Sequence, residues 1–388
     1  MCPSAPYRLC TRCVMDTSDP EIGFDDAGVC SHCHFFDRVI RPRWRPEANS
    51  QGRLDAILAR IRAHGRGHDY DCILGISGGI DSSYLAYLAT RQWGLRVLGC
   101  HVNAGWNTET AEANIANLVN RCGMELCTHV VDWEEVRDLQ IAYLKSGLAN
   151  QDVPQDHVFF ASLYETARQR GLKYVFTGAN YATESILPAA WGYNAMDSVQ
   201  LRAIHRRFGT APLVSYRTIS FFRRMIFLPY VAGQTVIRPL DFIPYDKQAA
   251  KALLQKEIGW KDYGLKHGES QFTRFFQNHW LPARFGYDKR RAHLSSMILS
   301  GLTTREEALA ELARPLYEPR QLEQDMAFVS KKLGLSVDDL QGLLNAPRHT
   351  ASEYPSEAWK YRLWTRLAGS RTVSRLAGAA KRLRQGMH

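Results

Sequence analysis

The chain has 388 residues, of which 45% are hydrophobic and 11% aromatic, so it is long enough for two or three domains with a sizeable core. This composition excludes a disordered protein, and no apolar run approaches the ~20 residues that a membrane-spanning helix needs. The first residues include no apolar stretch of the kind found in secretory signals, so we expect a cytoplasmic protein.

The N-terminal segment, residues 1–45, contains two Cys-x-x-Cys pairs with sixteen residues between them. This spacing is typical of a zinc ribbon, in which four thiolates close a tetrahedral site and metal binding drives folding of the small module. We therefore predict a structural Zn²⁺ site formed by Cys10, Cys13, Cys30 and Cys33. His32 and His34 flank the second pair and are alternative ligands.

An apolar stretch that begins at Cys72 leads into a turn rich in serine and glycine, residues 77–83, and then into a helix. Glycines let the backbone approach a phosphate, and the N–H groups and helix dipole favour an anion. The sequence Ser-Gly-Gly-Ile-Asp-Ser resembles the PP-loop of the ATP-pyrophosphatases, which cleave ATP between the α and β phosphates. It is neither the Walker A nor the dinucleotide-binding pattern. The resemblance implies that ATP is bound by Ser77, Gly78, Gly79, Asp81, Ser82 and Ser83.

Strand-like and helix-like runs alternate after the zinc ribbon. Apolar runs predict parallel strands at 71–76, 96–102 and 173–177, with a further possible strand at 127–132. Helices are predicted at 54–64, 84–91, 108–121 and 159–170. This alternation predicts an α/β domain over residues 50–260, built on a doubly wound parallel sheet of the PP-loop type.

In such a sheet, ligands bind at the carboxyl ends of the strands. Two strand ends besides the loop carry polar residues: His101 and Asn103 follow the second strand, and Gly178 and Asn180 follow the strand at 173–177. The corresponding turns in PP-loop enzymes complete the nucleotide pocket. The resemblance therefore implies that these four residues also contact ATP.

Four carboxylates lie near these turns. Asp81 suits either coordination of Mg²⁺ or capping of the helix after the loop. Glu184 is a candidate for binding Mg²⁺ or for orienting the nucleophile. Asp152 and Asp156 precede the helix at 159–170; Asp152 is a candidate substrate contact, whereas Asp156 is expected to cap that helix.

From about residue 246 the pattern becomes helical. The predicted helices are 245–258, 294–300, 304–314, 318–333 and 337–344. We expect residues 261–350 to form a helical region that completes the site, followed by a basic tail at 351–388.

A dense polar segment supplies further candidates for chemistry. Lys266 and Arg274 are candidates to neutralise a phosphate or a substrate carboxylate, and His267 or Glu269 to accept a proton. Lys289 and Arg290 offer cations for substrate binding.

The net charge of +10 is uneven, because residues 358–388 contain eight Lys and Arg and no acidic residue. The rest of the chain is only about +2, which does not indicate a nucleic-acid-binding surface. Within the tail, Trp359, Leu363 and Trp364 alternate with the basic residues. Two interpretations stay open: a peripheral contact with the inner face of an anionic membrane, or a solvated tail that docks a partner.

The chain resembles the N-acetyl sugar amidotransferases of surface-polysaccharide, O-antigen and nonulosonate biosynthesis. The resemblance covers residues 10–317 and rests on a series of motifs. Besides the PP-loop and the Gly178-Ala179-Asn180 turn, they are Cys-x-x-Cys-Val-Met-Asp-Thr-Ser-Asp-Pro at 10–20, Gly28-Val29-Cys30-Ser31-His32-Cys33, Trp260-Lys261-Asp262-Tyr263-Gly264, Lys266-His267-x-Glu269-Ser270, Phe285-Gly286-Tyr287-Asp288-Lys289-Arg290 and Thr304-Arg305-Glu306-Glu307-Ala308.

The resemblance implies an ATP-dependent ligase-type reaction. The enzyme would adenylate the oxygen of a sugar acetamido group, and ammonia would then displace AMP to give an acetamidino group. The implied cofactors are ATP, Mg²⁺ and structural Zn²⁺. A glutaminase subunit with a cyclase-like subunit is expected to supply ammonia, and the substrate is a sugar or a nucleotide sugar.

Two other functions fit parts of the sequence. PP-loop tRNA thiolases also combine this loop with cysteine pairs, but they usually need further cysteines, and the remaining five here form no Cys-x-x-Cys pair. A non-catalytic scaffold that binds zinc and nucleotide is the second alternative, and the intact PP-loop argues against it.

Overall fold

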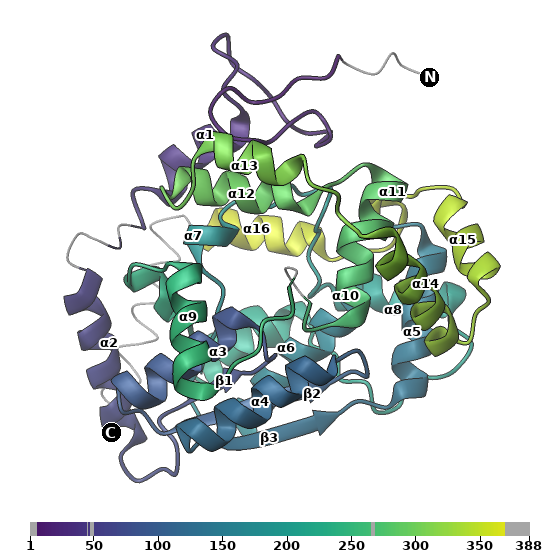
Figure 1. Cartoon of the computed structure of the whole chain (residues 1–388). Helices are drawn as coiled ribbons and strands as arrows, with labels where there is room; N and C mark the ends of the chain where they lie inside the picture. The colour runs from purple at the N-terminus through teal and green to yellow at the C-terminus, as the bar shows by residue number, and fades with distance from the viewer. Residues whose placement is uncertain (1–5, 45, 47–49, 265–267, 369–388) are drawn as a thin grey trace.

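The computed structural model describes residues 6–44, 46, 50–264 and 268–368 (Figure 1). At its centre is a five-stranded parallel sheet with the order β3-β2-β1-β4-β5. The strands are β1 Cys72–Gly75, β2 Val97–Asn103, β3 Glu125–Val130, β4 Tyr174–Phe176 and β5 Thr235–Ile237. The predicted parallel α/β sheet is confirmed. The short strand β5 was not predicted, because its three residues are too few to show a pattern.

The strand order creates a switch point beside β1. The chain starts at β1, moves outward through β2 to β3, and then crosses back to β4 on the other side of β1. The loops that leave β1 and β4 therefore diverge in opposite directions, and ligands of open α/β sheets bind in the crevice between such loops.

Helices surround the sheet and continue into a helical C-terminal region (Figure 1). Before and between the strands they are α1 Ser31–Phe35, α2 Ser50–Gly65, α3 Ile80–Tyr87, α4 Glu109–Cys122, α5 Trp133–Ser146, α6 Val153–Gln169, α7 Tyr181–Glu184 and α8 Ser198–Phe208. After β5 they are α9 Lys247–Ile258, α10 Gln271–Phe275, α11 Leu281–Phe285, α12 Lys289–Leu299, α13 Arg305–Leu312, α14 Pro319–Leu333, α15 Val337–Asn345 and α16 Ala358–Ala368.

Most predicted helices are present, but α1, α5, α7, α8, α10 and α11 were not predicted, and α16 lies in the segment expected as a basic tail. Helix α6 begins at Val153, six residues before the predicted start at 159. The capping box predicted at Thr304 and Glu307 is present at the start of α13. Among the described residues, no helix is long and apolar enough to span a membrane.

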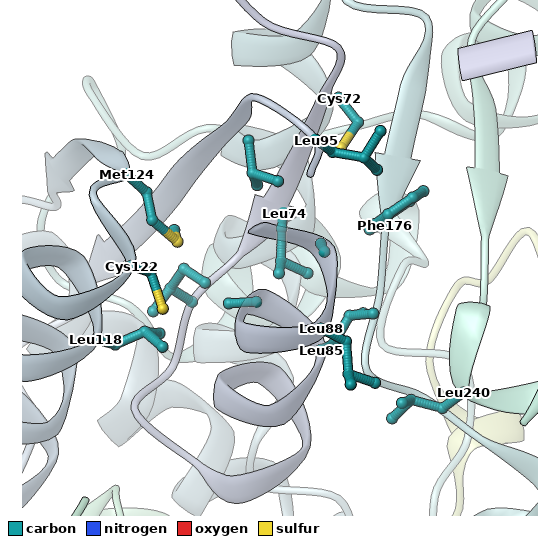
Figure 2. Close-up of a cluster of buried hydrophobic side chains, with 14 of the residues drawn as sticks. Cys72, Leu74, Leu85, Leu88, Leu95, Leu118, Cys122, Met124, Phe176 and Leu240 are labelled. Carbon is teal, nitrogen blue, oxygen red and sulfur yellow. The ribbon is translucent and has the colours of Figure 1, made fainter. Parts of the chain in front are cut away.

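Both faces of the central strand β1 are buried, whereas the edge strands β3 and β5 are partly exposed. Figure 2 shows the core on one face, in which Cys72 and Leu74 of β1 pack with Leu85 of α3 and with Leu88, the residue after that helix. Ile73, between those two β1 residues, lies in the second core on the opposite face. A strand buried on both faces reads as an uninterrupted apolar run, which is why β1 was visible in the sequence.

The C-terminal helices contact both the sheet and the N-terminal ribbon. In Figure 1, α12 and α13 lie beside α1, whereas α14 and α15 lie at the opposite side of the molecule. From α14, Lys332 reaches the loop after β2, where it donates a hydrogen bond to the carbonyl of Gly105. Its ammonium lies 5.3 Å from the ring centre of Trp106 and 5.0 Å from that of Trp133. The helical region is thus attached to the strand ends.

Candidate functional site

The serine–glycine loop between β1 and α3 has the shape of a phosphate cradle. Gly78 has a φ of +80°, and a Cβ atom there would lie 2.6 Å from the carbonyl oxygen of Ala111 in α4, so only glycine fits. The loop is closed by its own serines. The hydroxyls of Ser77 and Ser82 are 3.1 Å apart, and the N–H of Gly79 donates to the Ser77 hydroxyl over 3.2 Å. Ser83 is fully buried in the first turn of α3.

The turn after β4 lies directly against this loop. A Cβ atom at Gly178 would be 3.1 Å from the carbonyl carbon of Asp81 and 3.2 Å from the backbone nitrogen of Ser82. Asn180 caps α7 because its Oδ1 accepts a hydrogen bond from the N–H of Thr183 over 2.9 Å. The structure thus brings the two predicted turns together at the switch point, with the Asn180 side chain holding the turn in shape.

His101 and Asn103, at the end of β2, are engaged within the protein. The Nδ1–H of His101 donates to the carbonyl of Ile76 over 2.8 Å, so Nε2 is left to accept from the amide of Asn107 over 2.9 Å. Burial lowers the pKa of His101, which keeps the ring neutral. The side chain of Asn103 accepts from the N–H of Gly105. His101 therefore holds the backbone just before the phosphate loop, and Asn103 holds the backbone of the loop after β2.

Two carboxylates flank a buried tyrosine beside the loop. The hydroxyl of Tyr245 donates to Oδ1 of Asp81, in the first turn of α3. Burial raises the pKa of Tyr245, and the negative charges of Asp81 and, more weakly, Glu184 raise it further. Asp81 does not cap α3, whose N-cap residue is Gly79. One or two carboxylates beside a phosphate cradle suit a Mg²⁺–nucleotide complex.

Residues at the start of the helical region lie against the phosphate loop. The indole N–H of Trp260 donates to the carbonyl of Gly78 over 3.1 Å, and the N–H of Ile80 donates to the hydroxyl of Tyr263 over 3.3 Å. A Cβ atom at Gly79 would lie 3.0 Å from Oε1 of Glu269, so that carboxylate is adjacent to the loop.

Of the other residues predicted in this segment, Lys266 and His267 lie outside the described residues. Trp260, Tyr263 and Tyr245 were not predicted as site residues. Trp260 and Tyr263 belong to one of the motifs that carried the family resemblance, which was the available signal.

A second polar cluster joins the start of α6 to α10. The carboxylate of Asp152 accepts hydrogen bonds from Thr273 over 3.0 Å and from Gln277 over 3.1 Å. The Ser270 hydroxyl donates to the side-chain oxygen of Gln155 over 3.2 Å. Asp152 thus ties the sheet domain to the helical region.

The prediction that Asp156 caps the helix is wrong, because α6 starts earlier than the sequence indicated. Residue 152 occupies the N-cap position, and Asp156 lies one turn inside the helix. Burial, with a further contribution from the charge of Asp152, raises the pKa of Asp156 to about 7, while Lys289 opposes the shift. The surroundings of Asp156 therefore favour the protonated form of its carboxyl group.

The predicted substrate residues Arg274 and Arg290 have structural partners. Arg274 forms a two-pronged ion pair with Asp325, with N–O distances of 2.9 and 2.6 Å. Arg290 pairs with Asp288 and donates to the carbonyl of Glu311. Their guanidinium groups hold the C-terminal helices together.

The four predicted metal ligands form one buried cluster. Their sulfur atoms lie within 4.8 Å of one another, and the separations for Cys10–Cys33 and Cys13–Cys30 are 3.8 and 3.6 Å. A tetrahedral thiolate site with metal–sulfur bonds of ~2.3 Å requires sulfur separations of about 3.8 Å. The cluster therefore fits a four-coordinate metal ion. The alternative ligands are engaged elsewhere, because His32 pairs with Asp19 and His34 with Asp25.

Arginines from the C-terminal helices donate hydrogen bonds to the backbone of the cysteine cluster. Arg305 donates to the carbonyls of Cys13 over 3.2 Å and Cys10 over 3.0 Å, and Arg291 donates to the carbonyl of Val14 over 3.0 Å. The ribbon is thus fastened to the helical region.

A cavity of about 850 Å³ lies apart from the PP-loop. It is enclosed by the ribbon, the loop before α8, the α11–α12 loop and the segment before α16, with Tyr287, Arg348 and Trp359 among its lining residues. No residue of the loop at 77–83 lines it. The candidate nucleotide site at the strand ends is therefore distinct from this cavity.

The fold and the site combine a parallel sheet, a serine–glycine loop after its central strand with the shape of a phosphate cradle, and a four-cysteine ribbon. Residues 269–367 match the family model of the C-terminal domain of WbpG-like proteins of lipopolysaccharide (LPS) biosynthesis. The chain therefore carries a WbpG-like C-terminal domain, which begins at Glu269 beside the loop. No curated protein matches the chain in sequence.

Solved structures share part of the fold at low identity. An NH3-dependent NAD synthetase from Campylobacter jejuni is 14% identical, with a TM-score of 0.33, and the match covers 77% of this chain and 98% of that one. The U34-tRNA thiolase NcsA from Methanococcus maripaludis, with its [4Fe-4S] cluster, is 15% identical over 64% of this chain and 74% of its own, with a TM-score of 0.33. An NMN synthetase from Francisella tularensis is 14% identical over 55% and 96%, with a TM-score of 0.29. At these scores the likeness carries no argument about activity.

Proposed function

We propose that this protein is an ATP-dependent N-acetyl sugar amidotransferase of LPS biosynthesis, which converts an acetamido group to an acetamidino group. One observation carries the proposal: Glu269, where the WbpG-like domain begins, lies against Gly79 of the phosphate loop. The region that matches LPS biosynthesis proteins thus lies against the loop that we propose to bind nucleotide. This is the arrangement needed if ATP activates a sugar substrate.

The proposed reaction has two steps. The amide oxygen attacks the α-phosphorus of ATP, the α–β bond breaks, and pyrophosphate leaves. Ammonia then attacks the imidate carbon, the carbon–oxygen bond to AMP breaks, and the nitrogen loses a proton. Adenylation is required because a neutral amide is a poor electrophile. Without it, the amide oxygen would have to leave as hydroxide, which is a poor leaving group.

The described residues have distinct proposed roles. The backbone of residues 77–83 holds the departing pyrophosphate, since oriented N–H groups stabilise developing negative charge. Asp81 and Glu184 are the carboxylates available to Mg²⁺. Glu269 and Asp156 are candidates to accept the proton from the incoming nitrogen, with Lys266 and His267 as proposed additional groups from the undescribed segment.

We also propose that the cysteine cluster holds structural Zn²⁺ and that a glutaminase partner, with a cyclase-like subunit, supplies ammonia. A closed tetrahedral thiolate shell suits a structural role, because no ligand position is left for substrate. The sugar or nucleotide-sugar acceptor would enter between the loop and the cluster at Asp152. Neither partner proteins nor nucleic acid is needed for the first test, since ammonium salts can replace a glutaminase.

The test is a reaction of the purified chain with ATP, Mg²⁺, an ammonium salt and a panel of diacetamido sugars and their nucleotide-linked forms. We expect AMP and pyrophosphate to form only with the correct acceptor, and mass spectrometry to show an amide oxygen replaced by NH. ¹⁵N-ammonium should label the product.

The control is the double variant Ser77→Ala with Asp81→Ala, which should lose AMP formation while keeping its metal. AMP formation with sulfide and tRNA but with no sugar would assign the thiolase function instead. A third outcome is that ATP binds but no AMP is released with any sugar of the panel, even when the glutaminase partner is added. This outcome would contradict the enzymatic proposal and favour a scaffold.

A further inference from the structure

Two segments that are far apart in the sequence contain no acidic residue. Residues 198–240 include seven arginines, and residues 358–388 include eight Lys and Arg, with no Asp or Glu in either. The whole chain has a net charge of +10, so all other residues taken together are net negative. The basic character of this protein is therefore concentrated in two segments rather than spread over its surface.

The described parts of these two segments pack against each other. Phe221 meets Tyr361 of α16 edge-on, with ring centres 4.8 Å apart, and Tyr230 meets Trp364 at 5.9 Å. The N–H of Phe221 also donates to the carboxylate of Glu357, just before α16. Helix α16 therefore rests on the irregular helical stretch at 221–231, and the two basic segments contribute to one surface.

Large apolar side chains of this joint surface face solvent. Phe222 is 63% exposed and Val231 56% exposed, and on α16 Trp359 is 56% and Leu363 48% exposed. Arg362 and Arg366, one turn apart on α16, are exposed too, and neither forms an ion pair with another described residue. We call this set the apolar–basic patch. It consists of Phe222, Tyr230, Val231, Trp359, Arg362, Leu363 and Arg366.

We propose that the apolar–basic patch docks the protein on an anionic membrane surface. The contact is peripheral: α16 and the 221–231 stretch lie along the headgroup region, the apolar side chains enter the acyl boundary, and the arginines meet lipid phosphates. This assignment is independent of the amidotransferase proposal.

Lipid fits the patch better than the other anionic partners. Phe222, Tyr230 and Trp359 are aromatic and can stack on nucleobases, but the aliphatic side chains of Val231 and Leu363 would stay in water on a nucleic acid, whereas they leave water at a lipid surface. The boundary between headgroups and acyl chains accepts aliphatic, aromatic and guanidinium groups together. The sequence beyond α16 contains five Lys and Arg and no Asp or Glu, which adds attraction to an anionic leaflet.

The experiment is co-sedimentation of the full chain with phosphatidylcholine vesicles that contain or lack phosphatidylglycerol. We expect binding only to the anionic vesicles, and weakening by salt. Each of Arg362→Gln and Arg366→Gln should weaken binding about fivefold, as expected for a basic residue at an anionic surface. Phe222→Ser with Val231→Ser should weaken it by at least as much, because apolar insertion is lost.

Matched substitutions elsewhere provide the control. Val130→Ser replaces an apolar residue that is 78% exposed on β3, and Arg60→Gln removes an exposed charge from α2. Both variants should bind vesicles like the original chain. As a second readout that does not depend on variants, brominated lipids should quench the tryptophan fluorescence of the bound protein.

Several outcomes would overturn the proposal. These are equal binding to neutral and anionic vesicles, no binding to either, or loss of binding in the control variants as well. Preferential binding of a single-stranded RNA oligomer that the patch variants abolish would assign the surface to nucleic acid. Capture of an acidic protein partner by the patch, with no affinity for vesicles, would assign it to protein docking.

Discussion

The hydroxyl of Tyr245 donates a hydrogen bond to the carboxylate of Asp81, so a residue just before α9 orients an acidic group at the phosphate loop. Tyr245 is 3% exposed and stacks on Tyr84, with ring centres 5.6 Å apart, which fixes the position of the hydroxyl. Asp81 therefore has a defined orientation before any nucleotide binds. A preoriented carboxylate loses less entropy when it coordinates a cation.

The substitution Tyr245→Phe should release Asp81 while keeping the ring packing. We expect about tenfold weaker Mg²⁺-dependent ATP binding, measured by calorimetry, and a loss of about 1 kcal/mol in the free energy of unfolding. Tyr84→Phe is the matched control, because Tyr84 contributes its ring to the same stack. Equal effects of the two variants would mean that the Asp81 hydrogen bond has no role in binding.

Gly178→Ala should disturb the loop from the β4 side. The new methyl group would lie within 3.2 Å of the backbone of Asp81 and Ser82, which is closer than ordinary contacts, so the loop or the turn must move. We expect ATP binding to weaken on the order of tenfold, in an equilibrium-binding measurement. Gly342→Ala in α15 is the control, since nothing lies within 4 Å of its added methyl. If the Gly178→Ala variant binds ATP with unchanged affinity, the turn after β4 does not contribute to nucleotide binding.

Cys13→Ser should remove one of four ligands from the buried cluster. We expect the bound metal, measured by elemental analysis, to fall from one ion per chain by about tenfold, and protease cleavage within residues 6–40 to become faster because the small module depends on the metal. Cys127→Ser changes a free thiol outside the cluster and should keep the metal. Retention of one ion by the Cys13 variant would exclude a four-cysteine site.

Asp156→Asn should change how stability depends on pH. In the folded protein the pKa of Asp156 is raised to about 7, so the folded state binds a proton that the unfolded state releases near pH ~4. The original chain should therefore lose stability from this group as the pH rises from about 4 to 7. The variant lacks that loss and should be more stable at pH ~8, on the order of 2 kcal/mol, with little difference at pH ~4. Denaturant titrations at both pH values provide the measurement, and a variant less stable at pH ~8 would contradict the raised pKa.

The sequence was most informative where a local pattern determines the structure. The loop at 77–83 and the cysteine spacing each define their geometry within a few residues, so both could be predicted. The partners of that loop could not, because Trp260 and Glu269 lie more than 180 residues away in the chain and contact it only through the fold. Likewise, Arg274 has the composition of a phosphate ligand, but Asp325, fifty-one residues further on, neutralises it.

The contacts of the C-terminal region with the ribbon and the phosphate loop have a consequence for folding during synthesis. The ribbon and the phosphate loop are both translated early, yet Arg305 holds the first and Trp260 and Glu269 line the second. During synthesis, the nucleotide pocket therefore lacks a wall until most of the chain has left the ribosome. If the proposed function is correct, a chain that ends before residue 260 should be unable to consume ATP, because it lacks both of these contacts.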